Sequence, residues 1–400
     1  MQQCKKYSTA LTKHDKKRST KYGKKRSTKY SAVAVKIKTG KPVAPLEVYA
    51  GKKAHETILK NGFSPELFSY FLGASGGPKW FSLAGLDRVL FPEWFANVQH
   101  QIHVIGSSAG AFRAICAVQN DPLAAINRLA QSYSTTTYSS NKPTAREITA
   151  KAEDLLKEMV SDKGKQEVLA NERFKAHLIV AKCLGATRFE SKLQQLSGLA
   201  MSAAANTVSR KNLAKLYERY VFSSPNSHLT ISDPYGMPSH FHSLTEGNIH
   251  SALLASGSIP IVIEGVKEIE GAPVGMYRDG GIIDYHFDVS FGPDEGLVLY
   301  PHFYNKPIPG WFDKGLKRRV PHRSSYDNVV MLVPSPSFVA KLPYGKIPDR
   351  KDFEVLDAPT RIKYWQTVLS ETDSLGEYFM EAVNDGRLVN CIKPLPFNQR

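Results

Sequence analysis

Short apolar runs alternate with amphipathic segments along most of the chain, which is the pattern of strands and helices taking turns in an α/β protein. Phe68–Leu72 and Ile102–Ile105 predict buried strands. Each is followed by a glycine-rich turn and then by apolar residues at helical spacing, over Lys79–Leu90 and Ala109–Val118. Pro78 suits the first turn of the first of these helices, where its missing N–H is not needed. The pattern predicts a three-layer α/β/α fold around a mostly parallel central sheet.

The middle of the chain carries a different pattern. Residues 122–220 are predicted to be almost wholly helical, with one break at the polar loop Ser132–Pro143. Ala145–Val160 and Glu190–Tyr220 carry apolar residues at helical spacing. We therefore expect a helical insertion here, which either caps the functional site or packs as an ordinary part of the fold.

Strands and helices alternate again beyond the insertion. The predicted strands are His228–Ser232, Val274–Arg278, Leu297–Tyr300 and Asn328–Val333, and the predicted helices are Ile249–Ala255 and Ala358–Asn384. Residues 46–400 are accordingly expected to form one domain, with residues 122–220 as its insertion.

Net charge is concentrated in the first residues of the chain. The whole protein carries +16, and residues 1–41 contribute +13 of it through 12 Lys and 2 Arg against one Asp. A basic heptapeptide, Lys16–Tyr22, is repeated as Lys24–Tyr30. Such composition predicts a disordered basic tail over residues 1–45. Three interpretations stay open: a solvated tail, attachment to an anionic membrane surface, and, least favoured, nucleic-acid binding.

Three glycine-marked turns follow predicted strands, and together they offer the parts of an acyl-transfer site. Gly106-Ser107-Ser108-Ala109-Gly110 matches the G-x-S-x-G elbow, in which Gly106 and Gly110 permit a sharp turn and Ser108 projects its hydroxyl. Gly73–Gly77 is rich in exposed backbone N–H groups, and Asp279–Gly281 presents a carboxylate. Sites in open α/β sheets form outside the carboxyl ends of strands, so these turns are expected to meet there.

These motifs resemble those of the patatin-like phospholipases, a family of Ser–Asp dyad acyl hydrolases. The glycine-rich oxyanion loop of that family, G-G-G-x-[RK]-G, aligns with Ser75–Trp80. Its G-x-S-x-G-A elbow matches Gly106–Ala111, and its D-G-[GA] motif matches Asp279–Gly281. Ala255–Pro260 is similar to the A-S-x-x-x-P stretch upstream of the dyad Asp. The resemblance covers about residues 68–300.

The resemblance implies a role for each matched residue. Ser108 is the nucleophile and Asp279 is its base, without an intervening His. Gly76 and Gly77 supply oxyanion donors, and Lys79 braces their loop. The implied activity is that of a phospholipase A or lysophospholipase, acting on phospholipid or other acyl esters with no cofactor. The chain departs from the family motif at two positions, where Ser75 and Trp80 replace glycines.

Other interpretations of the same residues remain open at this stage. Ser75 lies in a second G-x-S-x-G match, Gly73–Gly77, and is the rival nucleophile. A carboxylesterase with a Ser-His-Asp triad is an alternative, because three histidines follow Asp279, namely His286, His302 and His322. A non-catalytic lipid-binding member is another alternative. Arg278 either tunes the charge of its neighbour Asp279 or faces solvent.

Metal binding and membrane spanning are not favoured. His240, His242 and His250 have no ligand motif around them, no calcium-loop motif is present, and the site is expected to hold no metal. No apolar run approaches the roughly 18 residues of a spanning helix. The four cysteines lie far apart, as is usual in a reducing compartment. The expected location is the cytoplasm, with peripheral membrane contact through the basic tail.

Overall fold

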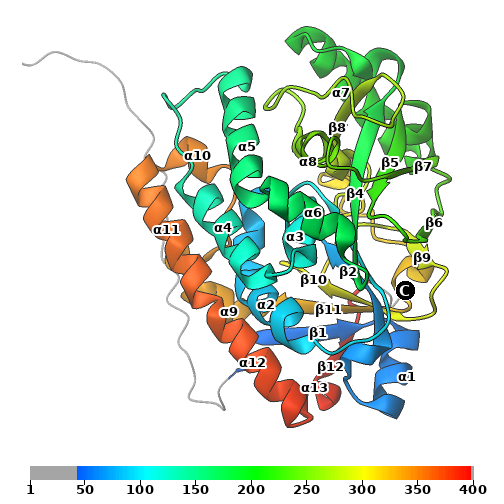
Figure 1. The fold of residues 1–400 in the computed structure, drawn as a ribbon, viewed down its shortest axis with the longest axis vertical. Coiled ribbons are helices and arrows are strands. Elements are labelled where there is room, and N and C mark those ends of the chain that lie inside the picture. The colour runs from blue at the N-terminus through cyan, green and yellow to red at the C-terminus, as the bar shows by residue number, and fades with distance from the viewer. Residues whose placement is uncertain (1–42, 398–400) are drawn as a thin grey trace, which may run out of the picture. The chain divides into compact units, whose positions relative to one another are not determined.

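The computed structural model describes residues 43–397, which form an α/β fold around one large sheet (Figure 1). The expected tail, residues 1–45, lies almost entirely outside the described residues. The ten-stranded sheet has the order β12-β1-β11-β10-β2-β3-β4-β5-β7, with β8 paired to β4, and β6 and β9 form a separate ribbon. The strands are β1 Leu46–Ala50, β2 Phe68–Gly73, β3 Ile102–Ser107, β4 Phe174–Cys183, β5 Tyr217–Ser223, β6 Thr230–Ser232, β7 Ser239–Ser243, β8 Met276–Asp279, β9 Ser290–Gly292, β10 Leu297–Pro301, β11 Val329–Pro334 and β12 Ile392–Pro394.

Most neighbouring strands of the large sheet run parallel, and its antiparallel pairs are β1–β11, β4–β5 and β4–β8; the β6–β9 ribbon is antiparallel. The helices are α1 Lys52–Asn61, α2 Ala84–Val89, α3 Ala109–Val118, α4 Pro122–Thr135, α5 Ala145–Met159, α6 Asp162–Ala170, α7 Lys192–Val208, α8 Ile249–Gly257, α9 Pro336–Lys341, α10 Asp352–Val355, α11 Ala358–Glu371, α12 Asp373–Asn384 and α13 Arg387–Asn390. The expected α/β fold with a mostly parallel central sheet is confirmed.

The sheet lies between two different outer layers. Side chains of adjacent residues on a strand point to opposite faces, so Tyr70 and Phe71 of β2 identify the layers. The ring of Phe71 contacts Phe91, just beyond α2, with centroids 4.8 Å apart, whereas Tyr70 stacks on Phe291 of β9 at 5.9 Å. The first face is covered by helices that include α2, α3, α4, α11 and α12 (Figure 1). The second face is covered in part by the β6–β9 ribbon, which contributes Phe291.

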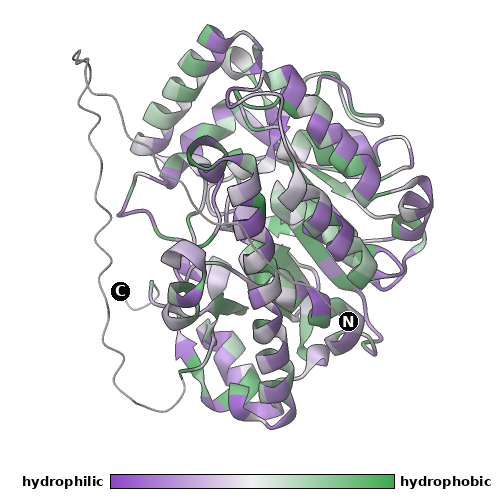
Figure 2. Cartoon of the chain, turned by 90° about the vertical axis from the view of Figure 1, so that its left-hand side faces the viewer, coloured by the Kyte–Doolittle hydropathy of each residue, from purple (hydrophilic) through white to green (hydrophobic). Residues whose placement is uncertain are grey.

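The strands carry the apolar core. Every residue of β2, β3, β10 and β11 is buried, as strands covered on both faces require. Figure 2 shows these central strands in green between helices that alternate between green and purple. The helices therefore bury one apolar stripe each and expose the other side to solvent.

The prediction that residues 122–220 are almost wholly helical is wrong. α4, α5, α6 and α7 lie in this segment, but so do β4 and β5, which are part of the central sheet. β4 consists of Phe-Lys-Ala-His-Leu-Ile-Val-Ala-Lys-Cys, nearly all of it buried. A fully buried strand has no alternation of polar and apolar residues, so periodicity does not distinguish it from a buried helix.

Two predicted helices are interrupted in the structure. The expected helix Lys79–Leu90 begins as a 3-10 turn, Gly77–Leu83, and becomes α-helical only in α2. The expected helix Ala358–Asn384 is divided at Thr372 into α11 and α12. The amide of Gly85 in α2 donates to Thr372 Oγ1 at 3.1 Å, and a Cβ on Gly85 would lie only 1.8 Å from the Thr372 carbonyl oxygen. The two helices α11 and α12 are thus divided where Thr372 contacts α2. This contact arises from tertiary packing, so the sequence pattern does not predict it.

Candidate active site

Ser108 occupies a strained turn between β3 and α3. Its φ is 53° and its ψ is −128°, a conformation that residues with a Cβ rarely adopt. The turn also brings α3 very close to β2, because a Cβ on Gly110 would lie 1.8 Å from the Gly73 carbonyl oxygen. A Cβ on Gly106 would lie 2.2 Å from the Gly110 carbonyl oxygen. Both glycines of the elbow are therefore required sterically, and the strain at Ser108 is held by the packing around it.

The hydroxyl of Ser108 donates a hydrogen bond to Asp279 Oδ2 at 2.9 Å. β4 brings the two residues together, because β3 and β8 pair with successive stretches of the same edge of β4, while β5 pairs with its other edge. Ser107 is paired with Ile179 of β4, and Asp279 is paired with the next residue, Val180. Residues separated by 171 positions in sequence thus become neighbours through a strand that the sequence pattern did not reveal.

Burial raises the pKa of Asp279 to about 6. The Gly281 amide donates to Asp279 Oδ1 at 2.7 Å, and this bond and that of Ser108 act in the opposite direction. The positive charges of Arg350 and Lys314 also lower this pKa. A carboxylate with a pKa near 6 is ionised at neutral pH and is close to the value that suits a general base.

The glycine-rich loop presents free backbone donors beside the dyad. Among the described residues, the amides of Gly76 and Gly77 donate to no protein acceptor. Both glycines line the same cavity as Ser108 and Asp279. Gly77 has a φ of +55°, which favours glycine at this position. Ala109 follows Ser108 at the start of α3, and its amide is also without a protein acceptor in the described part of the chain.

Lys79 joins this loop to a segment near the C-terminus, since its ammonium forms an ion pair with Asp349. Burial, followed by the charge of Arg350, lowers the pKa of Lys79 to about 8. This contact fits the bracing role expected for Lys79. It leaves the amides of Gly76 and Gly77, rather than the Lys79 side chain, as free donors beside Ser108.

The dyad opens into a cavity of about 1120 Å³. Part of its wall is apolar and consists of Ile259–Ile263, together with Ile148 of α5 and Phe353 of α10. Ile261 has a φ of 71°, unusual for a β-branched residue, and its amide donates to Gln195 Oε1 at 2.8 Å. The loop Tyr138–Pro143 and the first turns of α5 also line the cavity. This part of the insertion therefore covers the site, whereas β4 and β5 lie in the sheet below.

Ser75 and Trp80 both point away from the cavity. Ser75 is 1% exposed, and its hydroxyl is hydrogen-bonded to Ser107 Oγ at 2.6 Å. The amide of Ser75 donates to the Tyr285 carbonyl at 3.1 Å. Trp80 is fully buried and packs on Phe81 with centroids 4.9 Å apart. The two departures from the glycine motif therefore serve the packing beneath the loop and leave the pocket unobstructed.

No histidine among the described residues is hydrogen-bonded to Ser108 or Asp279. His286 lines the cavity, but its Nδ1 accepts from the Ile308 amide at 2.8 Å. Burial lowers the pKa of His286 well below its usual value. His302 is bonded to Tyr304 and His322 to Ser324. The described geometry brings together the parts of a dyad and not those of a triad.

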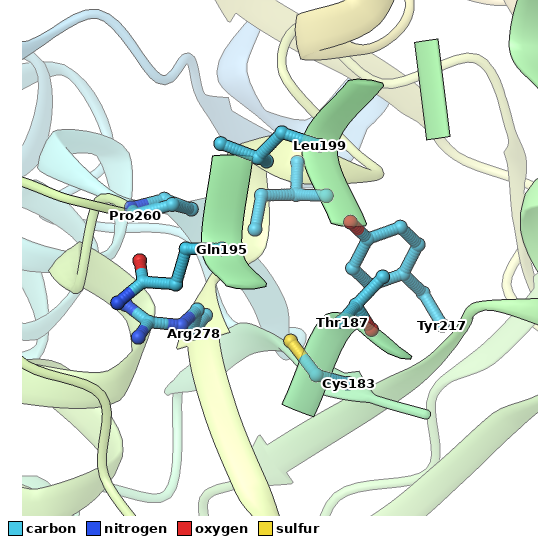
Figure 3. Close-up of a pocket in the computed structure, with 8 residues that line it drawn as sticks. Cys183, Thr187, Gln195, Leu199, Tyr217, Pro260 and Arg278 are labelled. Carbon is cyan, nitrogen blue, oxygen red and sulfur yellow. The ribbon is translucent and has the colours of Figure 1, made fainter. Parts of the chain in front are cut away.

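Arg278 neither faces solvent nor lies against the carboxylate of Asp279. It is buried on the other face of β8, forms an ion pair with Glu190 and donates to the Ile263 carbonyl at 3.2 Å. Figure 3 shows its side chain in a small space with Gln195 and Cys183. Sequence adjacency to Asp279 was misleading because consecutive strand residues point in opposite directions.

The histidines considered as metal ligands have separate partners. His242 Nδ1 is bonded to the Gly271 carbonyl at 2.8 Å, and His250 Nε2 to the Val160 carbonyl at 2.8 Å. His240 lies 3.6 Å from Glu218. Within residues 43–397, no three His, Cys, Asp or Glu side chains are grouped as a metal ion would require.

Sequence reasoning did not find Arg350 and Lys314, which face the dyad from the C-terminal third of the chain. Neither belongs to a local motif, so only the folded structure reveals them.

The chain matches no protein-family model and no curated protein sequence. The resemblance to patatin-like enzymes therefore rests on the motifs and on the geometry they adopt. None of the described helices is both long and apolar enough to cross a membrane.

Proposed function

We propose that this protein is a serine hydrolase of carboxylic esters, of patatin-like type, that acts on lipid acyl groups through the dyad Ser108–Asp279. The observation that carries this proposal is the 2.9 Å hydrogen bond from the hydroxyl of Ser108, on a strained elbow, to a buried carboxylate. Both groups face a cavity whose apolar wall suits an acyl chain.

The proposed reaction follows from the positions of these groups. Asp279 accepts the proton of Ser108 as the serine oxygen attacks the ester carbonyl carbon. The carbonyl oxygen then carries negative charge, which the free amides of Gly76 and Gly77 stabilise. Each such donor typically lowers the barrier by about 3 kcal/mol. The tetrahedral intermediate collapses, the alcohol leaves with the proton from Asp279, and an acyl-enzyme remains. Asp279 then activates a water molecule that releases the fatty acid.

Lipid esters are favoured over small soluble esters by the size and lining of the cavity. A volume of about 1120 Å³ exceeds what a short ester fills, and the Ile259–Ile263 segment offers continuous apolar contact. A cytoplasmic location with peripheral membrane contact through the basic residues 1–45 belongs to the same proposal.

Labelling with a fluorophosphonate probe, followed by peptide mapping, tests the nucleophile. We expect modification at Ser108 and its loss in Ser108→Ala, with strong reduction in Asp279→Asn. Ser75→Ala is the matched control, since it removes the hydroxyl of the other G-x-S-x-G match and should retain labelling. Modification at Ser75, or none on folded protein, would contradict the proposed dyad.

Hydrolysis of long-chain and short-chain esters then tests the substrate class. We expect aggregated long-chain lipid esters to be cleaved with much higher kcat/KM than soluble acetyl esters. Equal rates would indicate a general carboxylesterase.

A further inference from the structure

Two cationic side chains that act on Asp279 from the cavity wall lack a carboxylate partner. Lys79 is paired with Asp349, but neither Arg350 nor Lys314 forms an ion pair or a side-chain hydrogen bond with any described residue. The ammonium of Lys314 lies over the ring of Tyr285, 3.9 Å from its centroid. A guanidinium has five donors, and those of Arg350 are not buried, so they can bind the oxygens of a ligand in the cavity.

Both cations lie close to the reacting groups. The Cγ of Arg350 is 3.1 Å from the point where a Cβ on Gly77 would stand, so its side chain packs directly on the oxyanion loop. The charges of Arg350 and Lys314 both lower the pKa of Asp279. Desolvation, followed by the charge of Arg350, lowers the pKa of Lys314 to about 7, although part of the residue stays exposed to solvent. An anion between them would relieve the repulsion.

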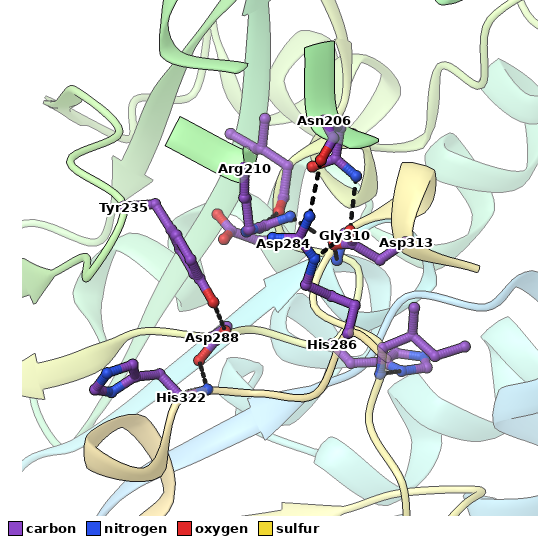
Figure 4. Close-up of polar contacts among 12 residues, drawn as sticks. Asn206, Arg210, Tyr235, Asp284, His286, Asp288, Gly310, Asp313 and His322 are labelled. Atoms are coloured by element: carbon purple, nitrogen blue, oxygen red, sulfur yellow. Dashed lines mark hydrogen bonds and ion pairs between the residues drawn. The ribbon is translucent and has the colours of Figure 1, made fainter. Parts of the chain in front are cut away.

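The segment that carries Lys314 is held in place by a buried polar cluster. The preceding residue, Asp313, is fully buried and accepts from Asn206 Nδ2 at 2.7 Å, Arg210 Nη1 at 3.0 Å and the Gly310 amide at 2.9 Å (Figure 4). These bonds tie the turn to α7 and to the 3-10 turn that follows it. Lys314 is thus presented from a rigid support, as a binding residue requires.

Arg350 is supported in a similar way. The buried carboxylate of Asp352 accepts from Trp365 Nε1 at 3.1 Å and from the Asp349 amide at 2.8 Å. The carbonyl of Arg350 accepts from the Phe353 amide at 3.1 Å. These bonds hold the loop that carries Arg350 in place, while the guanidinium of Arg350 remains free to bind a ligand.

The cavity as a whole is lined by more positive than negative side chains. Six cationic side chains line it against three carboxylates, of which Asp279 is the base and Asp349 is paired with Lys79. We propose that Arg350 and Lys314 form an anion subsite that selects acyl esters carrying a phosphate monoester near the scissile bond. The two negative charges of that group match the two cations nearest the dyad, and Arg350 can bind two of its oxygens at once. This inference rests on the proposed ester hydrolysis.

A pair of substrates that differ only in the phosphate tests the subsite. An acylglycerol phosphate and the monoacylglycerol of the same chain length are compared by kcat/KM. For the wild type, we expect the phosphate-bearing ester to be preferred, with the phosphodiester lysophosphatidylcholine between them. Arg350→Gln should reduce the preference about 10- to 100-fold, mainly through KM, because a charge-assisted contact is lost.

Lys351→Gln is the matched control, since it removes one positive charge from the adjacent position of the same loop. A specific contact predicts that Lys351→Gln keeps the preference for the phosphate-bearing ester. Equal losses in Lys351→Gln and Arg350→Gln would indicate a diffuse positive field and overturn the subsite.

Binding to the Ser108→Ala variant separates the subsite from the reaction. Calorimetry with the acylglycerol phosphate should show binding that Arg350→Gln weakens, and inorganic phosphate should compete only weakly. Inorganic phosphate binding as tightly as the lipid would indicate a site for the free ion and overturn substrate selection. Hydrolysis without preference would overturn the subsite and leave the proposed function intact. Absence of both Ser108 labelling and hydrolysis would overturn the function, while this binding measurement would still decide the subsite.

Discussion

Replacing Asp279 by Asn should stabilise the folded protein while removing its proposed base. Burial raises the pKa of Asp279 from its usual 3.8 to about 6, which means that the folded state disfavours the ionised carboxylate. A pKa difference of this size corresponds to about 3 kcal/mol, because each pKa unit is worth about 1.4 kcal/mol. The amide of Asn is similar in shape and neutral at every pH, so folding of the variant does not require the burial of a charge.

The size of the effect depends on pH. Above about pH 6 the folded wild type carries the full cost of a buried charge, and Asp279→Asn should be more stable by on the order of 3 kcal/mol. As the pH falls from 6 toward 3.8, the carboxyl binds its proton in the folded state and the difference shrinks. Below about 3.8 both states of the wild type are protonated and no difference from this source remains. Denaturant unfolding at pH 8, 5 and 3.5 measures this dependence.

A second buried aspartate provides the control. Asp284 is fully buried and forms a two-point ion pair with Arg219, at 2.6 and 2.9 Å. Asp284→Asn should destabilise the protein by about 1.5 to 3 kcal/mol, because Arg219 loses a charged buried partner and keeps Asp233 alone. Equal stability of wild type and Asp279→Asn across the pH range, or destabilisation by that variant at pH 8, would refute the burial argument.

Three further outcomes are expected. The kcat/KM for ester hydrolysis should fall by about tenfold per pH unit below about pH 6, because protonation of Asp279 removes the base; a profile flat to pH 5 would contradict this. Gly110→Ala should abolish folding or lower the unfolding midpoint sharply, because its Cβ would meet the Gly73 carbonyl oxygen at 1.8 Å; a wild-type melting curve would show that the elbow relaxes. Asp87→Ala should cost about 3 to 5 kcal/mol in urea unfolding, because it leaves buried Arg113 without the carboxylate that it binds at 2.7 Å through two nitrogens. A loss under 1 kcal/mol would mean that water replaces the carboxylate.

The sequence by itself determined the elements with a local signal and the residues with a local motif. The strand Phe68–Leu72 and the helix Ala109–Val118 follow from continuous or periodic apolar positions, and the structure has β2 and α3 there. Ser108 and Asp279 were predicted as site residues because they lie in glycine-rich turns after predicted strands that match known motifs. Such signals depend on neighbouring residues alone, so no knowledge of the fold is needed to find them.

Only the tertiary structure decided how these parts meet and what surrounds them. β4 is buried on both faces, so it carried no periodicity, yet its pairing with β3 and β8 sets Asp279 beside Ser108. Arg350 and Lys314 reach the dyad from segments without a motif, and Arg278 faces away although it adjoins Asp279 in sequence. Contacts between distant segments depend on register, direction and packing of whole elements. A local pattern does not contain that information. The candidate residues Ser108 and Asp279 were therefore predicted from the sequence, whereas the groups that surround them were found only in the fold.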